Sequence, residues 1–192
     1  MKTRNGRFGF LVAFVCFFVL LASYGQDEKM QADSYSAVAM GTGGSVGGKA
    51  MPFNFRITSY TTDGEVDNFA ALLKEKGQDA LRSALDKEDK GRLNPTGSVG
   101  NQIAVARKRQ QGTETIITIV TARLMSFTEL YNNGRSKDYP FGYLQVKLND
   151  KGEGTGQIMA AAKLKFNKKS GHYEVESFGN QYIKAVNVRP SK

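Results

Sequence analysis

Residues 155–178 read TGQIMAAAKLKFNKKSGHYEVESF, with two alternating apolar and polar segments on either side of a turn. The turn at 167–171 contains Asn, Ser and Gly, residue types that favour tight turns. A period of two is typical of a strand that buries one face. We therefore predict a β-hairpin with strands at 155–166 and 172–178. The residues expected to face one shielded side are Ile158, Ala160, Ala162, Leu164 and Phe166.

Opposite charges predict how the two strands of this hairpin pair. If Phe166 lies opposite Tyr173, the apolar sides of both strands coincide. Each acidic residue of the second strand then has a basic partner on the outer face. The resulting pairs are Lys165 with Glu174 and Lys163 with Glu176.

His172, Glu174 and Glu176 occupy alternate positions of the second strand and share one of its faces. That spacing also suits a metal site or an acid with a base, so a hydrolase that uses Glu174 or Glu176 is an alternative function. The cross-strand lysines, however, already give both carboxylates a partner. We therefore predict a solvated strand face, with no catalytic residue and no metal ligand.

The same alternation predicts further strands on both sides of the hairpin. The segment at 113–125 is apolar on both faces, which is typical of a strand covered on both sides. Short turns separate consecutive strands, and helices do not alternate with them, so the sheet should be antiparallel. The other predicted strands are 53–57, 103–109, 141–148 and 181–189.

One helical segment follows the first predicted strand. Apolar residues recur at helical spacing from Val66 to Leu85, and Gly77 falls on this stripe. Gly77 either breaks the segment into two helices or lets it approach the sheet closely. The predicted fold class is α+β, with a strongly curved, mainly antiparallel sheet of about seven strands and one helical segment after the first strand. Such a sheet can close toward a barrel.

The first 25 residues are typical of an export signal. Lys2, Arg4 and Arg7 precede an apolar run at 8–21, and small residues come shortly before Gln26. We predict cleavage before Gln26 and an exported protein, either periplasmic or extracellular. The apolar run is shorter than the ~20 residues that span a bilayer, so no stable transmembrane anchor is expected.

Two further segments follow the predicted signal peptide at 1–25. Residues 26–50 are rich in Gly, Ser and Ala, and such a composition buries too little apolar surface to offset its backbone entropy. We predict a flexible leader there, followed by a single α+β domain at 51–192.

Composition excludes several kinds of site. The only cysteine, Cys16, lies inside the predicted signal peptide, and His172 is the only histidine. The mature chain would therefore have no disulfide, no thiolate metal site, no cysteine nucleophile and no pair of imidazole ligands. We predict no cofactor.

Two sets of residues are candidates for binding. Without residues 1–25 the chain has 24 basic and 18 acidic residues, a mild excess that attracts anionic partners. Basic residues near hairpin ends could converge into an anion-binding rim, extended by Lys147, Lys151, Lys163 and Lys165, or could simply keep these ends soluble. The rim residues are Arg107, Lys108, Arg109, Lys168 and Lys169.

The second set is aromatic and consists of Phe141, Tyr143 and Tyr182. On a concave sheet face these side chains would line an apolar pocket for a small molecule; otherwise they belong to the core.

The predicted function follows mainly from what is excluded. The sequence favours a non-enzymatic binding or accessory module of the cell envelope or the extracellular space. Its partner would be a small molecule or an anionic envelope polymer, and export excludes nucleic acid as a partner. The alternatives are a hydrolase that uses surface carboxylates and a basic module for adhesion within the envelope.

Overall fold

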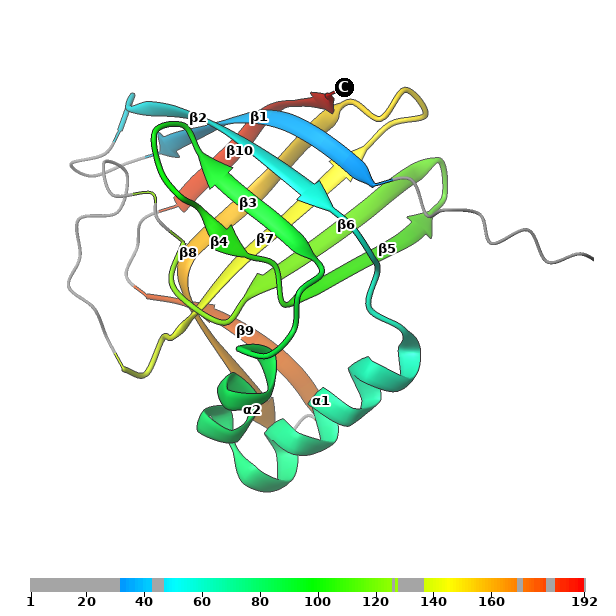
Figure 1. Cartoon of the computed structure of the whole chain (residues 1–192), viewed down its shortest axis with the longest axis vertical. Helices are drawn as coiled ribbons and strands as arrows, with labels where there is room; N and C mark the ends of the chain where they lie inside the picture. The colour runs from blue at the N-terminus through cyan, green and yellow to red at the C-terminus, as the bar shows by residue number, and fades with distance from the viewer. Residues whose placement is uncertain are drawn as a thin grey trace, which may run out of the picture.

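A strongly curved antiparallel sheet with two short helices makes up the part of the chain that the computed structural model describes, which is residues 32–42, 47–125, 127, 137–168, 171–178 and 182–191 (Figure 1). The α+β fold with a curved antiparallel sheet is thus confirmed. These residues form ten strands, not about seven. The elements are β1 (Asp33–Thr42), β2 (Ala50–Ile57), α1 (Asp63–Lys76), α2 (Gln78–Leu85), β3 (Gly91–Pro95), β4 (Asn101–Gln102), β5 (Val105–Gln111), β6 (Glu114–Thr121), β7 (Phe141–Leu148), β8 (Gly154–Asn167), β9 (His172–Ser177) and β10 (Tyr182–Pro190).

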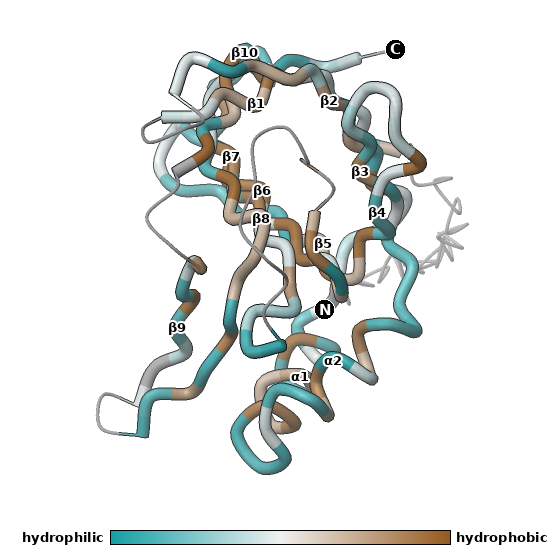
Figure 2. The backbone as a smooth tube through the Cα atoms, turned by 90° about the vertical axis from the view of Figure 1, so that its left-hand side faces the viewer, coloured by the Kyte–Doolittle hydropathy of each residue, from teal (hydrophilic) through white to brown (hydrophobic). Residues whose placement is uncertain are grey.

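The strands follow the order β4-β3-β2-β1-β10-β8-β7-β6-β5, and β9 pairs with β8 outside this path. Figure 2 shows the strands arranged as a ring, with β9 and the end of β8 projecting from it. β5, the strand at one end of the sheet, meets the segment just after β2 at Thr61. The Thr61 amide donates to the Ala106 carbonyl over 2.7 Å, and its hydroxyl accepts from the Ala106 amide over 3.0 Å. The sheet therefore curls into a barrel-like shape around an apolar interior.

The expected flexible leader at 26–50 is wrong for residues 33–42, which form β1 between β2 and β10. Tyr35, Ala37 and Ala39 point into the interior and are buried, while serines and then Val38 and Met40 alternate with them on the outer face. Small side chains suffice there because strands on both sides satisfy the backbone. The sheet thus begins at Asp33, before the domain start expected at residue 51. Residues 26–31 and 43–46 of the expected leader lie outside the described residues.

The region between the helices and β5 contains β3 and β4, which are not among the strands predicted from the sequence. These strands are short, and Leu93 is the apolar residue of β3 with the deepest burial. Backbone pairing with β2 holds β3 in place, a contribution that hydrophobic periodicity does not reveal.

The single predicted helical segment is two helices separated at Gly77. This residue has φ 81°, which a side chain would disfavour, and it ends α1 and starts α2. Leu81 and Leu85 of α2 are buried against the outside of the sheet. Among the residues described, no helix has the length and apolar character needed to cross a membrane.

The β8–β9 hairpin pairs as predicted, with Lys165 opposite Glu174 and Lys163 opposite Glu176. The expectation that the apolar residues of β8 share one side is wrong. Phe141 of β7 pairs with Ala162 and Tyr143 with Met159, so β8 contains one extra residue, a β-bulge. The residues before and after the bulge therefore belong to different clusters. Ile158 and Ala160 lie in the barrel interior, whereas Ala162 and Leu164 pack in the cluster under the helices.

Candidate binding groove on the outer face of the sheet

The predicted anion-binding rim does not form one site. Arg107 donates to the Thr61 carbonyl over 2.7 Å and pairs with Asp63, whereas Lys108 pairs with Asp33 over 3.0 Å. These two basic residues therefore hold the seam between β5 and the chain around β1 and the segment after β2. The other rim residues lie elsewhere: Arg109 is exposed on β5, Lys168 is exposed beyond the end of β8 in the projecting hairpin, and Lys169 is outside the described residues.

The predicted aromatic pocket is not assembled by the described side chains. Phe141 is fully buried in the cluster between sheet and helices. Tyr143 is half-buried on the outer face, and its hydroxyl accepts a hydrogen bond from Gln145 over 3.1 Å. The backbone of Tyr182 pairs with Thr42, and its side chain lies outside the description.

The carboxylates of the alternative hydrolase site are engaged by neighbours. Lys165 lies 3.4 Å from Glu174 and 3.0 Å from Glu176. Hydrogen bonds from Asn167 to Glu174 and from Tyr139 to Glu176 are the main causes that lower the pKa of each carboxyl. The lowered pKa favours the ionised form of each carboxyl, which disfavours a role as general acid but leaves a role as base open. This geometry favours a structural role for both residues.

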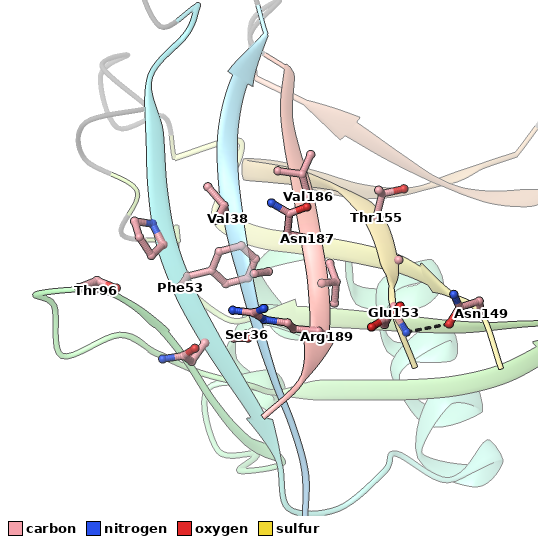
Figure 3. A pocket seen from close by; sticks show the side chains of 15 residues that line it. Ser36, Val38, Phe53, Thr96, Asn149, Glu153, Thr155, Val186, Asn187 and Arg189 are labelled. Atoms are coloured by element: carbon pink, nitrogen blue, oxygen red, sulfur yellow. Dashed lines mark hydrogen bonds between the residues drawn. The ribbon is translucent and has the colours of Figure 1, made fainter. Parts of the chain in front are cut away.

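Two adjoining clefts lie on the outer face of the sheet, and together we call them the outer groove. One cleft has a volume of about 700 Å³ and lies over β2, β1, β10 and the start of β8; the other has about 760 Å³ and lies over β10, β8 and β7. Thr155 and Val186 line both clefts, so the groove is continuous across β10. Figure 3 shows the first of the two clefts with both residues labelled. Its hydroxyl and amide side chains come from Ser36, Thr42, Asn54, Thr96, Gln145, Asn149, Thr155, Gln157 and Asn187.

The charge of the outer groove is predominantly positive. Lys147 and Lys184 line one cleft and Arg189 lines the other, and all three side chains are exposed. Glu153 is the only acidic residue among the described residues that line the groove. None of the three basic residues forms a salt bridge within the described parts of the chain. Their charges are therefore available to a ligand.

A second β-bulge shapes the middle of the groove. On one side of β10, Val186 pairs with Val38 and Arg189 with Ser36; on the other, Ala185 and Val188 pair with Gly156 and Gly154. In both cases β10 has one residue more than its neighbour. The extra residue is Asn187, whose φ of 53° is the only left-handed value at a residue other than glycine in the described chain. A bulge of this kind redirects side chains and is common next to binding sites.

The chain matches no protein-family model, no curated protein and no solved structure. The properties of the groove therefore carry the functional conclusion by themselves.

Sequence reasoning identified Lys147 but not the groove residues of β10. One signal was present: apolar residues at 183 and 185 change phase to 186 and 188 within a single strand. A shift of phase by one residue is the mark of a bulge. The sequence does not show which residues lie around this bulge, because β10 pairs with β1 and β8, which are distant in sequence. These residues are Lys184, Asn187 and Arg189.

Proposed function

We propose that this protein is an exported, non-enzymatic binding module that holds an anionic polymer of the cell envelope or extracellular space in its outer groove. The observation that supports this best is that three basic residues, Lys147, Lys184 and Arg189, line one continuous groove and have no salt-bridge partner among the described residues. A charged, open groove attracts a ligand of opposite charge and speeds its association.

The length of the groove favours a polymer over a small ion. Two clefts of about 700 and 760 Å³ lie side by side, and their basic residues are distributed over both. An extended chain with repeated negative charges would contact all three basic residues together, whereas a single anion would contact one. The export signal predicted at 1–25 would place the protein among envelope polymers and away from nucleic acid.

A charge-removal experiment tests this proposal. The chain at 26–192 is titrated with polygalacturonate and with polyphosphate by isothermal calorimetry at low and high salt. We expect binding that weakens as salt rises, because mobile ions screen exposed charges. The double variant Lys147→Ala/Lys184→Ala should bind about fivefold to thirtyfold more weakly, since each exposed contact contributes ~0.5–1 kcal/mol.

The matched control is Lys76→Ala/Lys87→Ala, which removes the same charge from exposed positions on and beside the helices. It should bind as the unmodified protein does. Equal losses in the two double variants would show a nonspecific effect of net charge, and no binding to either polymer would refute the proposed function.

A further inference from the structure

The bulge in β10 places two successive side chains on the same face of the sheet. In a regular strand Val186 and Asn187 would point to opposite faces. Here both line the outer groove, and Val188 is buried in the interior next to them. Asn187 therefore lies beside the junction of the two clefts, in the position shown in Figure 3.

The left-handed backbone at residue 187 favours glycine or asparagine, and of the two only asparagine supplies a side chain to the groove. A left-handed backbone is strained for most residues, and glycine adopts it without cost. Asparagine also adopts it, often because its side chain hydrogen-bonds nearby backbone. The Asn187 side chain makes no hydrogen bond to any described residue, and it is exposed. Its amide is thus free to contact a ligand.

The chemistry of this amide indicates which groups it would contact. An amide offers both an acceptor oxygen and a donor nitrogen, and so pairs well with hydroxyl groups, which also donate and accept. Ser36, Thr155 and Thr96 line the same cleft with hydroxyls of their own. Ionised phosphate and carboxylate groups offer only acceptors and would leave the amide oxygen without a donor.

We infer that the outer groove selects an acidic polysaccharide, with Asn187 contacting sugar hydroxyls and the three basic residues contacting its acidic groups. This inference rests on the proposed function and names the ligand class for the same groove. It assigns Asn187 a role in specificity that is separate from overall attraction to negative charge.

The test compares Asn187→Gly with the unmodified chain at 26–192. Glycine preserves the left-handed backbone and removes only the amide, so the melting temperature should stay close to its original value. Binding to polygalacturonate should weaken about threefold to tenfold, the loss expected for one or two hydrogen bonds. Binding to polyphosphate should not change. The control Asn68→Ala, which removes an exposed amide from α1, should affect neither ligand.

A second measurement needs no variant. The unmodified protein should bind polygalacturonate more tightly than polyphosphate of the same total charge at the same salt concentration. Equal affinities, or an unchanged affinity of Asn187→Gly for polygalacturonate, would overturn the inference. The proposed function would survive that result if the Lys147→Ala/Lys184→Ala variant still lost binding to both polymers.

Discussion

Gly154 shows how closely two backbones approach at the start of β8. A Cβ built at this residue would overlap the carbonyl oxygen of Lys147 on β7. Gly154→Ala must therefore move one strand away from the other, and overpacking of this kind costs about 1–3 kcal/mol. We expect a lower midpoint of urea unfolding, followed by circular dichroism.

The matched control for this variant is Gly64→Ala in the first turn of α1. No atom lies within 4 Å of a Cβ built there, and the backbone is not left-handed. Alanine has the higher helix propensity, by up to ~1 kcal/mol in a helix interior, so this variant should be as stable as the original or slightly more stable. A Gly154→Ala protein with unchanged stability would mean that β7 and β8 do not approach as described.

The ionisation of Glu65 makes the stability of the protein depend on pH. Glu65 accepts a hydrogen bond from Lys90 over 2.6 Å and, as part of a capping box, bonds from Thr62, and these contacts lower its pKa from 4.5 to about 2. Its stabilising contribution is present above pH 4.5, where the unfolded chain also carries the charge, and it disappears as pH falls toward 2. The Glu65→Gln variant should therefore be less stable than the original protein at pH 7. The difference in their stability should become smaller as the pH falls from 4.5 to about 2.

Thermal unfolding at several pH values measures this effect. Asp67→Asn removes one negative charge from the same helix at an exposed position without a salt bridge to the described residues. A similar narrowing for Asp67→Asn would show that net charge, and not the bonds to Lys90 and Thr62, causes the effect.

Some residue contacts could be predicted from sequence and others could not. Lys165 and Glu174 were assigned to each other because period-two alternation and opposite charge both fix the register of a hairpin. The expected partner of Glu176 was Lys163, yet the Lys163 ammonium lies 5.8 Å from the centre of the Tyr139 ring and Lys165 contacts both carboxylates. The register of the two strands follows from their sequence pattern. The rotamer of Lys163 depends on the Tyr139 ring, which is distant in sequence, and so it could not be predicted.

Among the elements, β1 differs most from what its sequence predicts. Ala37 and Ala39 on its inner face are small and Val38 and Met40 on its outer face are apolar, so its hydrophobic alternation is weak, and pairing with β2 and β10 holds it on both sides. The bulges in β8 and β10 were missed for a related reason. Each is an extra residue relative to neighbouring strands, so it can be seen only once those neighbours are known.

The place of β1 leads to a deletion experiment. A chain that starts at Gly47 should not fold, because β2 and β10 would each lose a paired edge and the interior would lose Tyr35, Ala37 and Ala39. A synthetic peptide of residues 32–42 added in excess should restore the native circular dichroism spectrum, whereas a scrambled peptide should not. Cooperative unfolding of the shortened chain without any peptide would show that β1 is dispensable.

For the molecule as a whole, the decisive contacts are those that join β5 to the start of β1 and to the segment after β2. Arg107 and Lys108 were candidates for anion binding, and in the structure their side chains make these contacts. Lys108 and the Tyr60 hydroxyl both contact the carboxylate of Asp33, at 3.0 and 2.5 Å. Burial and the bond to Asp33 raise the pKa of Tyr60, so its hydroxyl keeps the proton that it donates. The strong curl of the sheet is thus held by side chains as well as by backbone.

A substitution at Thr61 tests the role of this seam, because the Thr61 hydroxyl accepts the hydrogen bond that a neighbouring strand would otherwise accept from β5. Thr61 is buried and accepts a hydrogen bond from the Ala106 amide. Thr61→Val preserves the shape but leaves that buried amide without an acceptor, at a cost of about 1–3 kcal/mol in unfolding free energy. Thr61→Ser keeps the acceptor and should lose less. Hydrogen exchange at Ala106 should accelerate in the valine variant much more than exchange at Ile117, which is buried in β6 away from the seam. If exchange accelerated equally at both amides, Thr61 would stabilise the whole sheet without specifically holding β5 to the segment after β2.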